Sequence, residues 1–134
     1  MTSENNKAIV KDLIEANTLA SIDELCAPDF IGHLPGFPAP TDRKTFVDFA
    51  SMLYSAFPDL HHIVEVQLAE DDMVSSVVKV TGTHQGTFQG IPATGKKIVF
   101  YDLIVARFKD GKAVELWAQL DVLNLLQQLG VNPF

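Results

Sequence analysis

The chain has 134 residues, 47% hydrophobic and 20% charged, which fits one domain over residues 1–134 with a single apolar core and excludes disordered and fibrous classes. A net charge of −7 argues against nucleic-acid binding, because that function requires a concentrated basic surface. The sequence shows neither a signal-peptide pattern nor a membrane-length apolar run, so we expect a cytoplasmic protein that does not bind membranes.

Hydrophobic residues at helical spacing predict three helices in the first half of the chain. They cover residues 4–20, residues 21–27 and about residues 41–57. Ser3 and Ser21 are placed to cap the first two helices, because a serine side chain accepts a hydrogen bond from amides of the first turn. Pro28 and Pro58 follow the second and third helices, and proline cannot continue a helix.

After Pro58 the hydrophobic residues recur at every second position, which is the period of a β-strand. Strands are predicted over residues 60–72, 73–84, 97–108 and 113–120, with a hairpin turn at 110–112. A last short helix over residues 122–130 is predicted to end at Gly130. Three helices followed by a long antiparallel sheet predict an α+β domain with the helices packed on one face of a curved sheet.

The alternation also predicts which side chains share a face of the sheet. The first strand places on one side His62, Val64, Val66 and Leu68. In strand 97–108, Asp102 shares a side with Ile98, Phe100, Ile104 and Ala106. A carboxylate among such residues must be paired, protonated or facing a cavity. Asp102 is therefore a candidate binding residue, and an ion pair with Arg107 or with a partner subunit is the alternative.

Other chemical motifs are excluded by their surroundings. The segment GIPATGKK, residues 90–97, has the glycines and the lysine of a phosphate-binding loop, but Lys97 replaces the Ser or Thr and a strand follows in place of a helix. His61 and His62 point to opposite faces of a strand, and no HxxxH or CxxC motif exists, so no metal site is expected. Cys26 is predicted to be a small buried hydrophobe rather than a nucleophile.

Two segments carry a family resemblance: GTHQGTFQGIPATGK, residues 82–96, and DGKAVELWAQLDVLNLLQQLG, residues 110–130. With them, the chain resembles the SnoaL-like family, which includes polyketide cyclases, within the nuclear transport factor 2-like superfold. The resemblance implies a conical, cystatin-like α+β fold, one deep pocket per subunit, homodimers or tetramers, and no cofactor. It also implies ring closure by intramolecular aldol condensation, with an aspartate as general acid/base that falls on Asp121.

Asp121 and His33 are the candidate catalytic residues. An aldol ring closure removes a proton from carbon and returns one to oxygen, so one carboxylate in a water-poor pocket can serve both steps. Asp121 follows an apolar strand, on the same side as Trp117, but it is equally well placed to cap the helix over residues 122–130. His33 precedes a Pro/Gly-rich loop, where it either relays a proton at the pocket mouth or lies at the surface.

Further residues are candidates for substrate binding. His84 lies at a bend between strands and either orients a substrate carbonyl or forms a structural hydrogen bond. Tyr54, Phe100 and Trp117 are candidate contacts for a small apolar or aromatic ligand. Ile104 stands at the pocket position where several members of the family carry a second polar or acidic group, which argues against the isomerase chemistry known on this fold.

Two hypotheses remain. In the first, the protein is a cofactor-free enzyme acting on a small apolar carbonyl compound like a polyketide cyclase, with an isomerase or epoxide-hydrolase-like activity as a further alternative. It predicts a cavity of roughly several hundred Å³ lined by Asp121, His33 and Trp117. In the second, the protein is a non-catalytic binding or dimerisation module in which Asp121 only caps a helix and side chains fill the cavity.

Overall fold

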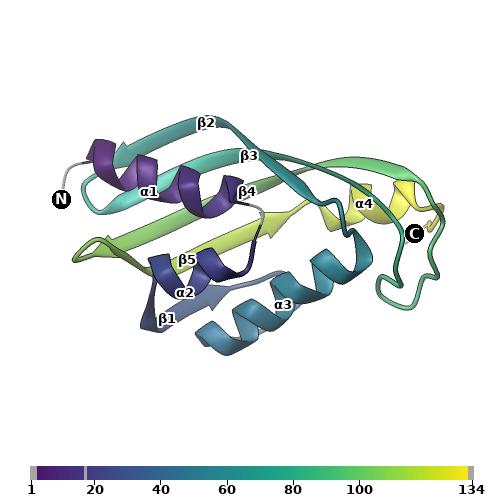
Figure 1. The fold of residues 1–134 in the computed structure, drawn as a ribbon, viewed down its shortest axis with the longest axis horizontal. Helices are drawn as coiled ribbons and strands as arrows, with labels where there is room; N and C mark the ends of the chain where they lie inside the picture. Colours follow the sequence, from purple (N-terminus) through teal and green to yellow (C-terminus); the bar gives the residue numbers. More distant parts are fainter. Residues whose placement is uncertain (1–2, 17, 133–134) are drawn as a thin grey trace.

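A five-stranded sheet organises the part of the chain that the computed structural model describes, residues 3–16 and 18–132 (Figure 1). The sheet order is β1-β5-β4-β3-β2; β1 runs parallel to β5, and the other neighbours are antiparallel. In chain order the elements are α1 Ser3–Glu15, α2 Ala20–Leu25, β1 Cys26–His33, α3 Arg43–Ala56, β2 His61–Glu70, β3 Met73–Thr83, β4 Lys97–Lys109, β5 Lys112–Leu120 and α4 Val122–Gln128. The predicted α+β class is confirmed.

Local signals in the second half of the chain place its turns and ends as predicted. The β4–β5 hairpin turns at Asp110 and Gly111, both with positive φ angles, which such tight turns require. Helix α4 ends at Gln128, and Gly130 follows its C-cap Leu129 with a φ of 91°. There the amide of Val131 donates to the carbonyl of Leu126 over 2.9 Å, the bond that closes a helix before a left-handed glycine.

The first half of the chain departs from the prediction at the second helix. Ser21 does not cap α2; it lies inside the helix, and its Oγ donates to the carbonyl of Thr18 over 3.0 Å. The helix ends at Leu25, and Cys26 already belongs to β1, a strand that the sequence does not predict. Because β1 lies at the sheet edge, with β5 as its one neighbouring strand in the described sheet, it tolerates Pro28, which would interrupt a central strand.

Both ends of α1 also differ from the prediction. Helix α1 begins at Ser3, so this residue is the first of the helix rather than its cap. The helix ends at Glu15, before the predicted residue 20.

Cys26 is a buried free thiol, and burial raises its pKa to about 11. The interpretation of this cysteine as an unreactive small hydrophobe is confirmed.

A β-bulge in β2 changes the face on which its later residues lie. Val64 pairs with Val78, but Val66 pairs with Val77, so one extra residue stands between these pairs. The prediction that Val66 and Leu68 share a side with His62 is therefore wrong, and their side chains are 51% and 70% exposed. Strands β3 and β4 keep a regular alternation, with Val74, Val78, Val80, Ile98, Phe100, Ile104 and Ala106 all buried.

Candidate functional site

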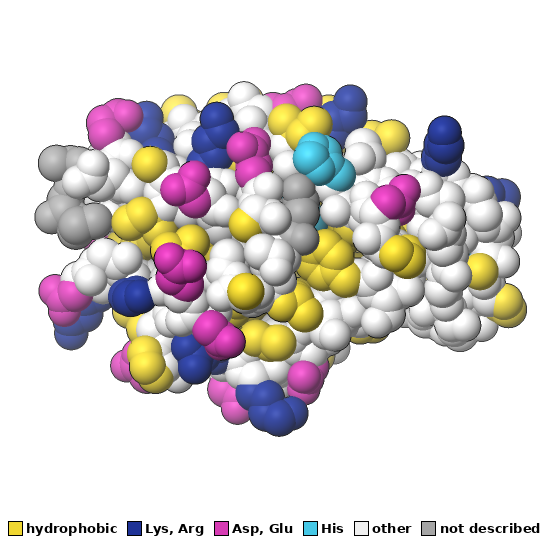
Figure 2. All heavy atoms as spheres, in the orientation of Figure 1, with side chains coloured by type: hydrophobic (Ala, Val, Ile, Leu, Met, Phe, Trp, Pro, Cys, Tyr) yellow, Lys and Arg dark blue, Asp and Glu magenta, His cyan; other side chains and the backbone are white. Residues whose placement is uncertain are grey.

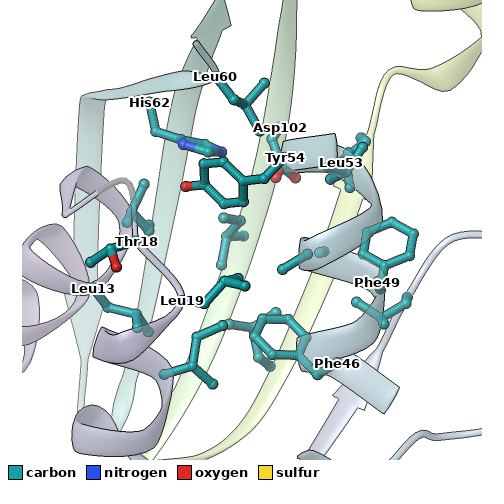
Figure 3. A pocket seen from close by; sticks show the side chains of 18 residues that line it. Leu13, Thr18, Leu19, Phe46, Phe49, Leu53, Tyr54, Leu60, His62 and Asp102 are labelled. Carbon is teal, nitrogen blue, oxygen red and sulfur yellow. The ribbon is translucent and has the colours of Figure 1, made fainter. Parts of the chain in front are cut away.

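A pocket of about 110 Å³ lies between the α1–α2 segment, α3 and the inner face of the sheet (Figure 3). Its wall is mostly hydrophobic, and four lining residues have polar side chains: Thr18, Tyr54, His62 and Asp102. Figure 2 shows hydrophobic side chains at the molecular surface between the positions that α1 and α3 occupy in Figure 1. The pocket is therefore an apolar site with a few polar groups, the usual character of a small-molecule site.

Helix α3 supplies one wall of this pocket through residues three and four positions apart. Phe46, Ala50 and Tyr54 lie on one stripe of the helix, and Phe49 and Leu53 lie on the neighbouring stripe. Figure 3 shows Phe46 and Tyr54 pointing from α3 into the pocket. Asp42 begins the helix as its N-cap, accepting a hydrogen bond from the amide of Thr45 over 2.8 Å, which lowers the pKa of its carboxyl.

Asp102 is the carboxylate of this pocket. It lies on β4 between inward-facing hydrophobic residues, and it is only 7% exposed. Burial raises the pKa of its carboxyl from 3.8 to about 7. Among the residues that the structure describes, its Oδ1 atom has no hydrogen-bond partner. The predicted alternative, an ion pair with Arg107, is not formed; that guanidinium lies within 3.5 Å of Asp72 and of Glu115.

His62 and Asp102 lie at the same end of the pocket, and Tyr54 reaches toward His62 from α3 (Figure 3). The rings of Tyr54 and His62 have centroids 6.3 Å apart. Burial, helped by the charge of His61, lowers the pKa of His62 to about 4, so its imidazole is neutral at pH 7. Burial also raises the pKa of the Tyr54 hydroxyl. Because β3 lies between β2 and β4, the two strands that carry His62 and Asp102 are about 10 Å apart.

Asp121 lies outside this pocket. It is exposed at the N-terminus of α4, and its Oδ1 accepts a hydrogen bond from the amide of Asn124 over 3.1 Å. The capping role that the sequence predicts as the alternative is therefore present. A catalytic role for Asp121 stays a prediction, and the pocket described here does not include this residue.

His33 and Trp117 lie on the opposite face of the sheet from the pocket. Their rings stack with centroids 4.9 Å apart, next to each other on β1 and β5. The Nε2 atom of His33 lies 2.7 Å from a carboxylate oxygen of Glu115, and the guanidinium of Arg107 lies over the Trp117 ring. The expected cavity lined by Asp121, His33 and Trp117 is thus not found; these residues do not line the pocket around Asp102.

The remaining candidates divide between the pocket and the core. Tyr54 and Ile104 line the pocket as expected, whereas Phe100 is fully buried without lining it. His84 is completely buried beside Phe57, and its Nδ1 atom accepts a hydrogen bond from the amide of Thr94 over 3.2 Å. The predicted structural hydrogen bond of His84 is therefore present, and this histidine does not line the pocket.

Sequence reasoning missed His62 and Thr18 as pocket residues. The alternation in residues 60–72 places His62 on the same face as Val64, which was a usable signal, because a histidine on the buried face of a strand requires an explanation. Thr18 offered none, since it lies between α1 and α2, where no periodic pattern applies.

In residues 3–16 and 18–132, no group of three or more His, Cys, Asp or Glu side chains could hold a metal ion. Every helix in the same part of the chain is too short or too polar to cross a lipid bilayer.

Comparisons with known proteins agree with this architecture. The SnoaL-like polyketide cyclase family matches residues 7–129. The aklanonic acid methyl ester cyclase DnrD of Streptomyces peucetius is 25% identical over 131 residues, covering 91% of this chain and 88% of DnrD. AclR of Streptomyces galilaeus, for which a hydroxylase activity has been suggested, superposes with a TM-score of 0.90 at 29% identity, covering 99% of this chain and 85% of AclR. IdmH of Streptomyces antibioticus, for which a polyketide cyclase activity has been suggested, superposes with a TM-score of 0.82 at 30% identity, covering 98% of this chain and 100% of IdmH.

Proposed function

The chain belongs to the SnoaL-like polyketide cyclase family, and from this premise we propose that it is a cofactor-independent enzyme in which Asp102 transfers protons on a small apolar carbonyl compound. The observation that carries the proposal is the buried carboxyl of Asp102 in an apolar pocket, with a pKa of about 7. At neutral pH such a group exists in both protonation states, which is the condition under which one side chain is both a good base and a good acid. The proposed chemistry is intramolecular aldol condensation.

The reaction uses Asp102 twice. Its carboxylate removes a proton from the carbon next to one carbonyl group, and the resulting enolate carbon attacks a second carbonyl carbon of the same molecule. A carbon–carbon bond forms, and the electrons of the attacked C=O bond move to oxygen. The protonated Asp102 then returns its proton to this alkoxide, so the product is a cyclic hydroxyketone and the carboxylate is regenerated. No oxidant, reductant or external proton is consumed.

His62 is proposed to stabilise the enolate. Because its pKa lies near 4, the imidazole is neutral and can donate a hydrogen bond to the oxygen of the first carbonyl without itself losing a proton. His62 and Asp102 both line the pocket, so a carbonyl compound bound there can contact the two groups. The apolar wall excludes water, which strengthens both interactions.

The test is turnover of two substrates by purified variants. One substrate is 2,6-heptanedione, a small diketone that closes to a six-membered ring. The other is aklanonic acid methyl ester, the compound in the name of the relative DnrD. Asp102→Asn is expected to lose at least about 100-fold in turnover of whichever compound the wild type cyclises, whereas Asp121→Asn keeps its turnover. The opposite result would place the acid/base at Asp121.

A non-catalytic binding module is the second candidate. The N-cap bond of Asp121 favours it, because capping α4 accounts for this aspartate without a catalytic role. The two candidates differ in a measurement on the wild-type protein alone. Binding of 2,6-heptanedione by calorimetry with no cyclised product after long incubation of both substrates would support the module. Cyclisation with a pH profile that rises near pH 7 would support the enzyme.

A further inference from the structure

A second apolar cavity lies next to the Asp102 pocket, beside α3. It has a volume of about 170 Å³ and lies between α3, the loop after β1, the β3–β4 loop and the start of α4. Its wall includes Met52 from α3, Phe88 from the β3–β4 loop and Leu125 from α4. Nothing in the proposed chemistry uses this cavity.

The two cavities are neighbours that share one wall. Phe49 and Leu53 of α3 and Leu120 at the end of β5 line both of them. On the helix, Phe49 and Leu53 are one turn apart and form a stripe. Met52 lies to one side of this stripe and lines only the second cavity, whereas Ala50 lies to the other side and lines only the Asp102 pocket. The side chains of Phe49, Leu53 and Leu120 therefore belong to the partition between the two cavities.

The β3–β4 loop, which contributes to the wall of the second cavity, is held in place by backbone hydrogen bonds. The β3–β4 loop is tied to the C-terminal end of α3, where the amides of Gln85 and Gly86 both donate to the carbonyl of Ala56 over 3.0 Å. At Gly86 a Cβ atom would stand 2.3 Å from the carbonyl oxygen of Ser55, so loop and helix are in close backbone contact. Any enlargement of the site is therefore expected through rotation of Leu53 and Phe49 rather than through movement of this loop.

We infer that the two cavities form one extended binding site, in which the partition residues Phe49 and Leu53 open to admit the apolar tail of a carbonyl substrate whose reacting end lies at Asp102. Volume supports this inference: about 110 Å³ alone is small, whereas 110 and 170 Å³ together approach the roughly 300 Å³ at which small-molecule sites begin. The substrate class is an elongated carbonyl compound with a continuous hydrocarbon segment. The inference rests on the proposed function, and it adds that tail length determines affinity.

The experiment compares 2-pentanone with 2-nonanone, two methyl ketones that differ by four methylene groups, by calorimetry and by NMR of protein labelled at the methionine methyl carbons. Met52 lines the second cavity, and Met73, at the start of β3, lines neither cavity and is the internal control. We expect 2-nonanone to bind at least about tenfold more tightly, since each buried methylene contributes up to about fourfold. We expect it to shift the Met52 methyl signal and to leave Met73 unchanged, whereas 2-pentanone shifts neither.

Variants test the same point without removing the core partition. Met52→Trp fills the second cavity and is expected to bring the affinity ratio of the two ketones close to one, whereas Met73→Leu keeps the wild-type ratio. If 2-nonanone saturates the protein without moving the Met52 signal, or if Met52→Trp keeps the wild-type ratio, the inference is wrong while the proposed function stands. If neither ketone binds, the extended site is also refuted. A failure of the proposed function appears separately, as unchanged cyclisation by Asp102→Asn.

Discussion

At the scale of single residues, burial shifts the pKa values of Asp102 and His62, two of the ionisable groups of the pocket, in opposite directions. It raises the pKa of Asp102 to about 7 and lowers the pKa of His62 to about 4. Both shifts favour the neutral form, because an apolar wall disfavours charge of either sign. A carboxylic acid and a neutral imidazole can therefore coexist in the pocket over a wide pH range without forming an ion pair.

The pKa of Asp102 predicts a pH-dependent stability. The unfolded chain releases this proton near pH 3.8 and the folded protein only near pH 7, so folding stability falls as pH rises between these values, by roughly 4 kcal/mol in full. Asp102→Asn removes this dependence. In urea unfolding, we expect the variant to gain stability relative to the wild type from pH 4 to pH 8. A constant difference across this range would contradict a raised pKa; Asp12→Asn, on the exposed face of α1, is the control.

His62 predicts a loss at the acid end. Its pKa is about 4 in the folded protein and 6.5 as a free group, so the unfolded chain takes up a proton first and stability falls as pH decreases from about 6.5 to about 4. His62→Gln, which stays neutral, is expected to be less sensitive than the wild type in this window. Unfolding midpoints at pH 4 and pH 7 measure the difference. An equal acid sensitivity of both proteins would contradict a lowered pKa of His62 in the folded protein.

At the scale of elements, the end of β5 and the start of α4 depend on one side chain. Asp121→Ala removes the cap bond to the amide of Asn124 and is expected to cost about 1 kcal/mol of unfolding free energy. Asp121→Asn keeps the cap, because asparagine is an equally good N-cap, but it cannot transfer a proton. Guanidinium denaturation of both variants checks the stability; a stable Asp121→Asn that has lost turnover would show that this residue acts in catalysis as well as capping.

The elements that the sequence predicts correctly are those whose signals are local. The hairpin at 110–112 and the stop at Gly130 follow from glycine at positive φ, and the inward row of β4 follows from strict alternation. Strand β1 was missed because it is an edge strand that contains a proline and pairs with β5, more than eighty residues away in sequence. The bulge after Val64 was missed because an added residue leaves no mark in the composition of β2.

The site is harder to predict than the elements, for a physical reason. Asp102 was identified because a carboxylate inside an apolar row is anomalous wherever it occurs. Asp121 was chosen from the family resemblance, His33 from its place before a Pro/Gly-rich loop and Trp117 as an aromatic residue on the side of Asp121. The pleat turns His33 and Trp117 to the outer face, and the turn into α4 exposes Asp121. Which face of the sheet carries the pocket is decided by the helices that pack on it, and no single segment encodes that choice.

At the scale of the whole molecule, the inner face of the sheet packs against α1–α3 in the described residues, whereas the outer face carries exposed apolar side chains beside polar ones such as Lys79 (Figure 1). On the outer face Tyr101 and Leu103 of β4 are 43% and 53% exposed, and neighbouring Ile63 and Val99 are exposed as well. Leu103 pairs with Val77 of β3, so this apolar surface continues across strands. Contiguous exposed hydrophobic side chains of this kind are typical of a protein–protein interface.

We therefore expect a homodimer formed through this outer face. An isologous contact places the same apolar patch on both subunits, and a stable one buries about 800 Å² on each. Leu103→Lys puts two charges of like sign into such a contact and is expected to shift the protein toward the monomer in sedimentation at micromolar concentration. Leu123→Lys, a similarly exposed leucine on α4, is the matched control and should leave the dimer intact.

A wild-type monomer would contradict the dimer altogether, and equal dissociation by both variants would place the contact elsewhere. Because Asp102 points to the inner face, dissociation by Leu103→Lys should leave ketone binding in place.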